Sequence, residues 1–163
     1  LLPLVRGSGS VLGLDLTVHR ESIRRTVGLL GHQNGLYLDL TVAENVHFWG
    51  ATVGASDAEM QAAMQRLDVA GRLADVGVSK LSAGQKRRTA LACLIARRAQ
   101  LWLLDEPHAG LDASARDELD QTLRQAAASG ATILLASHEL ERAGSLATRT
   151  VDVIAGRVHD VAP

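Results

Sequence analysis

The sequence predicts an α/β fold in which a largely parallel sheet carries helices on both faces. Two apolar runs, 101–104 and 132–136, have the length of strands and are almost continuously apolar, as strands covered on both faces are. A helix-length segment at about 113–128 separates them and is stopped by Gly130. Strands of this kind that alternate with helices are typical of a covered parallel sheet.

The other elements are predicted from helix caps, apolar runs and turns. Thr41 and Ser56 are each followed three residues later by a glutamate, which is the capping-box spacing of a helix start. Gly31 ends a short apolar strand. In chain order, the remaining expected elements are a strand at 26–30, a polar loop at 32–39, helices at about 42–51, 57–67 and 83–98, a short helix and strand, and a hairpin around 155–156.

The composition indicates one ordinary globular domain. With 163 residues, 47% of them hydrophobic and 21% charged, the chain falls outside the disordered and low-complexity classes. Its net charge of -1 argues against a strongly basic polyanion binder. The single cysteine, Cys93, excludes a disulfide within the chain, and no apolar run approaches the roughly 18 residues of a membrane span. We therefore expect a cytoplasmic protein.

Two carboxylates follow the first apolar run. In an open α/β sheet, ligands bind at the carboxyl ends of the strands. A buried strand holds Asp105 rigidly, which suits a ligand for a hard cation such as Mg²⁺. Glu106 lies one residue, about 3.3 Å, further along and is placed to orient and deprotonate a water. The alternative interpretation is a solvated strand end in a turn.

A second motif, Leu-Ser-Ala-Gly-Gln-Lys-Arg-Arg, occupies 81–88. Ser82 caps the helix, and Gly84 allows a close backbone approach, so that amides at the positive end of the helix can face a phosphate. The alternative is a capped helix with an exposed basic turn. This segment resembles the signature sequence of the ATP-binding-cassette ATPases, and 101–107 resembles their Walker B motif at the separation which that family uses.

Three more segments resemble the same family in order and spacing. Gln33 is similar to the Q-loop glutamine, which implies that its side-chain carbonyl reaches the metal and the attacking water. Residues 109–112, ending in Asp112, resemble the D-loop that crosses to the partner subunit. Residues 135–139 resemble the switch region, which implies that His138 contacts the γ-phosphate. Within the family, these segments look most like the haem-export ATPases of cytochrome c maturation.

The chain departs from the family at the phosphate-binding loop. A P-loop needs Gly-x-x-x-x-Gly-Lys-Ser/Thr, and neither Lys80 nor Lys86 stands in that pattern. The adenine-stacking aromatic is missing as well. We therefore expect a single partial nucleotide-binding domain over 1–163 that begins just beyond Walker A and lacks its N-terminal strands, with a helical signature subdomain at about 41–88. Such a chain should bind ATP poorly and expose an apolar face of its sheet.

The resemblance implies a head-to-tail dimer of two cassettes with Mg²⁺-ATP between them. Asp105 and Gln33 would bind the metal, with Glu106 and His138 as catalytic residues. In this family the signature of one subunit contacts the ATP bound by the other. The resemblance therefore implies that Ser82, Gly84 and Gln85 of the partner complete the ATP site.

The resemblance also implies an integral membrane permease as a partner and a position at the inner face of the cell membrane. The family receives a helix of the permease at about 32–50, where Phe48 and Trp49 are either contact residues or core.

Two other functions remain open from the sequence. One is a truncated, non-hydrolysing interaction module, which the absent P-loop would explain. The other is a soluble cassette ATPase that acts on nucleic acid, for which 86–88 and Arg97–Arg98 would be the basic surface. A solvated helix face explains those residues as well, and we expect no direct nucleic-acid partner. His108 departs from the residues usual after Pro107, and the sequence offers no account of it.

Overall fold

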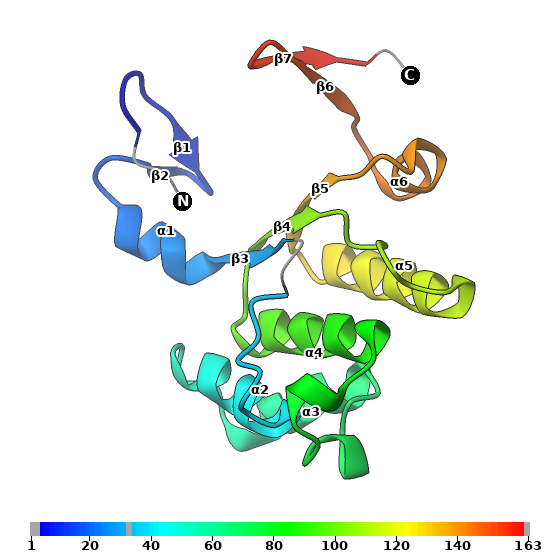
Figure 1. Ribbon diagram of the computed structural model, residues 1–163. Helices are drawn as coiled ribbons and strands as arrows, with labels where there is room; N and C mark the ends of the chain where they lie inside the picture. Colours follow the sequence, from blue (N-terminus) through cyan, green and yellow to red (C-terminus); the bar gives the residue numbers. More distant parts are fainter. Residues whose placement is uncertain (1–3, 32–33, 162–163) are drawn as a thin grey trace.

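The computed structural model describes residues 4–31 and 34–161 (Figure 1). In chain order its strands and α-helices are β1 (Ser10–Val11), β2 (Leu14–Asp15), α1 (Arg20–Thr26), β3 (Val27–Leu30), α2 (Val42–Ala51), α3 (Asp57–Arg66), α4 (Ala83–Ala96), β4 (Leu101–Asp105), α5 (Ala113–Ala128), β5 (Thr132–Ala136), α6 (Leu140–Leu146), β6 (Val151–Ile154) and β7 (Arg157–Asp160). Two short 3-10 helices, Gly71–Leu73 and Val78–Lys80, lie between α3 and α4.

The central sheet has the strand order β3-β4-β5, and both of its pairings are parallel. Leu29 pairs with Leu103, which pairs in turn with Leu134 on β5. The predicted α/β class with a parallel sheet is therefore confirmed. Because parallel strands end at the same edge, the segments after β3, β4 and β5 meet there, and this edge holds the candidate site. The β1–β2 and β6–β7 pairs are separate antiparallel hairpins.

One face of the sheet is covered by α4 and α5, which lie on the same side of it in Figure 1. Leu30, Trp102 and Leu104 point to this side and are 1%, 3% and 2% exposed. A Cβ on Gly28 would lie 2.5 Å from Leu94 Cδ2, so this glycine lets α4 pack close to β3. Helix and strand thus share one dry core.

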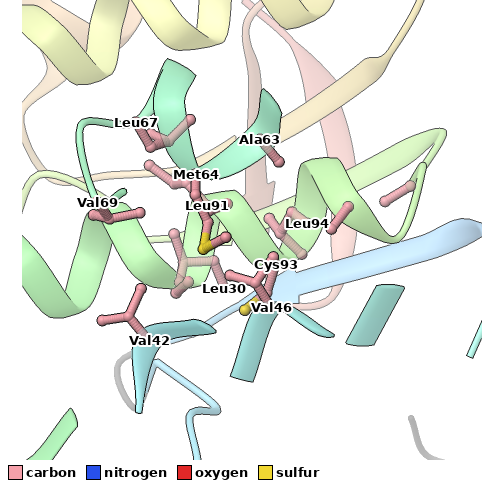
Figure 2. Close-up of a cluster of buried hydrophobic side chains, with 14 of the residues drawn as sticks. Leu30, Val42, Val46, Ala63, Met64, Leu67, Val69, Leu91, Cys93 and Leu94 are labelled. Carbon is pink, nitrogen blue, oxygen red and sulfur yellow. The ribbon is translucent and has the colours of Figure 1, made fainter. Parts of the chain in front are cut away.

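The helices α2 and α3 extend this core on the far side of α4. Figure 2 shows Val42 and Val46 of α2 and Met64 of α3 gathered against Leu91 of α4, and all four are at most 2% exposed. The predicted capping boxes are present at the starts of α2 and α3. Each box satisfies two backbone amides at its helix start, which fixes where the helix begins.

The other face of the sheet is open in the described residues. Leu29 is 61% exposed and Leu134 is 59% exposed. The expectation of helices on both faces is therefore met on one face of the described residues, and the expected exposed apolar face is present. No helix among the described residues is long and apolar enough to cross a membrane.

Helix α1 was not predicted from the sequence. It has seven residues, and its N-cap residue, His19, makes no side-chain capping bond. Ile23 is its single buried residue, so the apolar periodicity that reveals longer helices is absent. The helix runs directly into β3 at Thr26, where we had expected the strand to begin.

Candidate functional site

Glu106 and His138 meet at the sheet edge where β4 and β5 end. The Glu106 Oε2 atom lies 2.8 Å from His138 Nδ1, and the backbone amide of His138 donates to Glu106 Oε1 at 2.9 Å. The Ser137 hydroxyl donates to Oε2 at 3.4 Å. Two residues that the sequence proposed separately, 32 positions apart, thus form one hydrogen-bonded pair. The carboxylate is held at both of its oxygens.

The contact between Glu106 and His138 shifts the pKa of both side chains. The hydrogen bond from His138 lowers the pKa of Glu106, against the opposing effect of desolvation. The same bond, reinforced by the charge of Glu106, raises the pKa of His138. The pair therefore favours an ionised carboxylate with an imidazolium. The His138 side chain is 75% exposed and that of Glu106 is 30% exposed, so a ligand can reach both groups.

The backbone at Glu106 is in a left-handed conformation, with φ at 45°. Residues other than glycine rarely adopt this backbone conformation, because it is strained for them. Residues with such backbone strain are concentrated at functional sites. The amide of Glu106 donates to the carbonyl of Ala136 at 2.9 Å, which adds a hydrogen bond beyond the end of β4. Glu106 is therefore anchored to β5 at the point where the chain leaves the strand.

Asp105 is the last residue of β4, and its side chain is exposed. In the part of the chain that the structure describes, no group of three or more His, Cys, Asp or Glu side chains could hold a metal. Mg²⁺ is usually bound by one or two carboxylates together with substrate phosphates. A single carboxylate at a strand end can therefore bind Mg²⁺ only together with the phosphates of a substrate. Gln33, the second expected ligand, lies outside the described residues.

Arg87 argues against the alternative interpretation of 81–88 as a capped helix with an exposed basic turn. It is 5% exposed, and its guanidinium donates to main-chain carbonyls at the ends of β3 and β4. The other four basic residues of the surface considered for nucleic acid, 86, 88, 97 and 98, do not share one solvated face. Arg88 pairs with Asp68 and Glu118, and Arg98 binds Glu59. Arg97 stacks on Trp49, and Lys86 is half-buried.

The sequence does contain an indication that Arg87 is buried, although its place in a basic motif suggests an exposed residue. Arg87 stands four and seven residues before the buried Leu91 and Leu94 of α4. That spacing puts it on the buried stripe of the helix.

Ser82 and Gln85 form a reciprocal capping box at the start of α4. The Gln85 amide donates to Ser82 Oγ at 3.2 Å, and the Ser82 amide donates to Gln85 Oε1 at 2.9 Å. A Cβ on Gly84 would lie 3.7 Å from Leu111 Cδ2, an ordinary contact, so packing inside the chain does not require this glycine. Among the described residues, no hydrogen bond or ion pair joins Ser82, Gly84 or Gln85 to Glu106 or His138. Within the chain, these three residues therefore do not reach the Glu106–His138 pair, although Arg87 of the same motif contacts the end of β4.

Asp112 caps α5 by accepting a hydrogen bond from the Ala115 amide at 2.9 Å. Sequence reasoning missed Arg116, one turn further on. Its Nε donates to the carbonyl of Leu111 at 3.0 Å, and its Nη1 lies 3.1 Å from Glu139 Oε2. Arg116 therefore ties the segment 109–112 to the residue after His138.

The structure supplies an account of His108. Its side chain is 1% exposed, and Nε2 lies 2.7 Å from Asp120 Oδ1 on α5. Asp120 is also paired with Arg142 of α6. His108 is thus part of a buried polar network that joins the end of β4 to two helices. Nothing in its sequence neighbourhood indicated this, because its partner Asp120 lies 12 residues away on α5 and the Arg142 that pairs with Asp120 lies on α6.

A parallel sheet with a carboxylate and a histidine at its carboxyl edge, together with a capped signature helix, defines a nucleotide-binding cassette. The family model for ABC transporters matches residues 4–109, and the chain belongs to that family. Among similar curated proteins are the cytochrome c biogenesis ATP-binding export protein CcmA of Shigella sonnei, 37% identical over 137 residues, and that of Escherichia coli, 36% identical over 137 residues. Each alignment covers 81% of this chain and 63% of the relative.

Two solved structures have the same fold. The ATP-binding subunit of an ABC transporter is 28% identical, with a TM-score of 0.83 over 94% of this chain and 65% of that one. An ATP-binding cassette in a dimeric, post-hydrolysis state with ADP and Pi has a TM-score of 0.82 at 22% identity, over 98% of this chain and 75% of its own. The chain spans about 63% of the length of the curated relatives above, so their whole activity does not pass to it directly.

Proposed function

We propose that this chain supplies the hydrolytic half of an ATP site in an ABC transporter, with Glu106 and His138 as its catalytic residues. The observation that carries the proposal is the Glu106–His138 pair at the carboxyl edge of the sheet, joined at 2.8 Å. Membership of the ABC transporter family supports ATP as the substrate.

In this mechanism Glu106 acts as general base. Its lowered pKa keeps the carboxylate ionised near neutral pH, so it can accept a proton from an attacking water. As that O–H bond breaks, the water oxygen bonds to the γ-phosphorus. The bond to the bridging oxygen breaks, and ADP leaves with the electron pair. His138, which carries a raised pKa, exchanges its contact with Glu106 for the γ-phosphate and stabilises its charge.

Asp105 and Gln33 would hold Mg²⁺, which neutralises phosphate charge when it is bound. Asp105 contributes one exposed carboxylate from the rigid end of β4. From this position Asp105 would bind the metal, and Glu106 would act on the attacking water.

A second cassette, arranged head to tail, would complete the site. The start of α4 presents Ser82, Gly84 and Gln85 at a helix N-terminus, where amides and the helix dipole favour a phosphate. These residues make no hydrogen bond with the Glu106–His138 pair among the described residues, which favours their use by the opposite ATP. Asp112, at the exposed start of α5, would face the partner beside them.

An integral membrane permease is the proposed partner at the surface around α2. Tyr37 and Phe48 are 46% and 44% exposed and stack edge to face with ring centroids 4.9 Å apart. Trp49 is half-buried beneath the guanidinium of Arg97, at 4.6 Å, so it supports the surface from within. Phe48 is therefore the better contact candidate. With such a partner the protein would act at the cytoplasmic face of the membrane, where we propose that it powers export, with haem as cargo, in cytochrome c biogenesis.

The test is ATP turnover by the natural full-length protein that carries this sequence, with Glu106→Gln compared with Glu118→Gln. Glu118 is a 55% exposed carboxylate on α5 that matches the charge change away from the site. We expect Glu106→Gln to lose about 100-fold or more of turnover while it still binds ATP and dimerises. Unchanged turnover would refute the role of Glu106. An unaltered full-length protein that binds no ATP would favour the interaction module.

A further inference from the structure

Arg87 lies where three segments of the chain meet, and the proposed mechanism gives it no role. Its Nε donates to the carbonyl of Pro107 at 2.8 Å. Its Nη1 donates to the carbonyl of Gly31 and to Asn34 Oδ1, both at 2.9 Å. Its Nη2 donates to the carbonyls of Asp105 and Glu106. One side chain of α4 thus binds the end of β4 and the residues on either side of positions 32 and 33.

These contacts are made by a buried cation with neutral acceptors. No carboxylate forms a salt bridge with Arg87 among the described residues, although the charge of Asp105 lies near enough to act on it. Burial lowers the pKa of the Arg87 guanidinium, which nevertheless stays protonated. A buried charge is costly unless all its donors are satisfied, so the carbonyls at 31 and 105–107 must stay in place around it.

The consequence falls on Glu106. Its backbone is held in the left-handed region at φ 45°, its amide is bound to Ala136, and its carbonyl is bound to Arg87. Fixing both ends of this residue fixes the direction in which its side chain leaves the backbone. That direction brings both carboxylate oxygens to His138.

We propose that Arg87 is a positioning residue that holds the Glu106 backbone so that its carboxylate faces His138, and that it ties this geometry to Gly31 and Asn34. The inference rests on the proposed function, because it assigns a support to the same catalytic pair. A planar guanidinium has five donors in a fixed fork, whereas a lysine ammonium is a point charge with three. Lysine therefore keeps the charge at this position and loses the fork.

The first test is a pair of matched lysine variants, Arg87→Lys and Arg88→Lys, in the 163-residue chain. Arg88 is the next residue on α4, and its contacts are ion pairs with Asp68 and Glu118 on the protein surface. Both variants keep the net charge, so a change in a nearby titration reports geometry. The readout is the pH titration of the His138 imidazole by NMR, at a temperature where melting curves show each protein folded.

We expect Arg87→Lys to lower the pKa of His138 toward its ordinary value, because the released backbone loosens the two contacts with Glu106. Arg88→Lys should leave the titration of His138 unchanged. If Arg87→Lys fails to fold, Arg87→Gln takes its place, since a neutral side chain carries no charge to bury. Its expected result is the same downward shift, although the lost cation alone would raise the pKa.

A folded Arg87 variant in which His138 titrates as in the unaltered chain would overturn the inference and leave the proposed function intact. A His138 pKa at the ordinary value in the unaltered chain would instead contradict the Glu106–His138 pair itself. In the natural full-length protein, Arg87→Lys should lower kcat for ATP about 10-fold or more while KM changes less than about twofold, because Arg87 touches no substrate. A change in KM alone would also overturn the assignment.

Discussion

The two faces of the β3-β4-β5 sheet carry the same type of apolar residue, but one face is buried and the other is exposed. Leu29 and Leu30 are neighbours on β3, yet Leu29 is 61% exposed and Leu30 is 1% exposed. The same contrast separates Leu134 from the buried Leu104. An apolar run therefore identifies a strand, but it does not show which of the strand's faces is buried. Other segments bury it, and α4 and α5 do so on one side of the sheet. Stability of this chain should depend on one face of the sheet.

The largest expected effect separates the two neighbouring leucines. We expect Leu30→Ala to lower the free energy of unfolding by about 3 kcal/mol, because it leaves a cavity among residues that cannot collapse fully. Leu29→Ala, the matched control, should lower it by less than about 1 kcal/mol. Urea denaturation of the 163-residue chain measures both. Equal losses would show that the two faces are buried alike.

The next effect tests the closeness of α4 to the covered face. In Gly28→Ala, the new Cβ would lie 2.5 Å from Leu94 Cδ2 and 3.0 Å from Ala99 Cβ. We expect a loss of about 1–3 kcal/mol from overpacking. Gly144→Ala is the control, because nothing lies within 4 Å of its Cβ and the position is helical. That variant should be neutral or stabilising in the same denaturation experiment.

A smaller effect comes from the helices that support α4. Ser56 accepts a hydrogen bond from the Glu59 amide at the start of α3. Ser56→Ala should cost about 1 kcal/mol, since it leaves that amide without its cap. Gln61→Ala, an exposed change on the same helix, should cost less than about 0.5 kcal/mol. If the two variants melt at the same temperature, the cap contributes nothing to the covered core.

The smallest effect is expected on the open face. Leu134→Thr replaces a side chain that is 59% exposed with another good strand former. We expect the free energy of unfolding to change by less than about 0.5 kcal/mol. A loss comparable with that of Leu30→Ala would mean that this face is covered in solution.

The sequence predicted the features that depend on neighbours in the chain. The caps at Thr41, Ser56 and Ser82 are local patterns, and so are the strand ends that place Glu106 and His138 on one edge. The hydrogen-bond partners of Arg87 and His108 could not be assigned in that way, although the helical spacing to Leu91 and Leu94 indicates that Arg87 is buried. These partners lie 12 to 56 positions away, and only the folded chain brings a buried cation or imidazole to them.

The Glu106–His138 pair also sets a pH window. The pKa of His138 is raised, so its share of stability is full below its unfolded pKa and is lost as pH rises through the folded value. The pKa of Glu106 is lowered, so its share is present above its unfolded pKa and is lost as pH falls through the folded value. The pair is therefore intact between the two folded pKa values, that of Glu106 below its ordinary value and that of His138 above its ordinary value.

The most direct measurement is the NMR titration of His138 in the unaltered chain and in Glu106→Gln, with His138→Gln to identify its signal among the six histidines. Glutamine keeps an acceptor oxygen and loses the charge that stabilises the imidazolium. We expect the pKa of His138 to lie above the ordinary 6.5 in the unaltered chain and to return toward it in the variant. The same pKa in both proteins would contradict the catalytic pair.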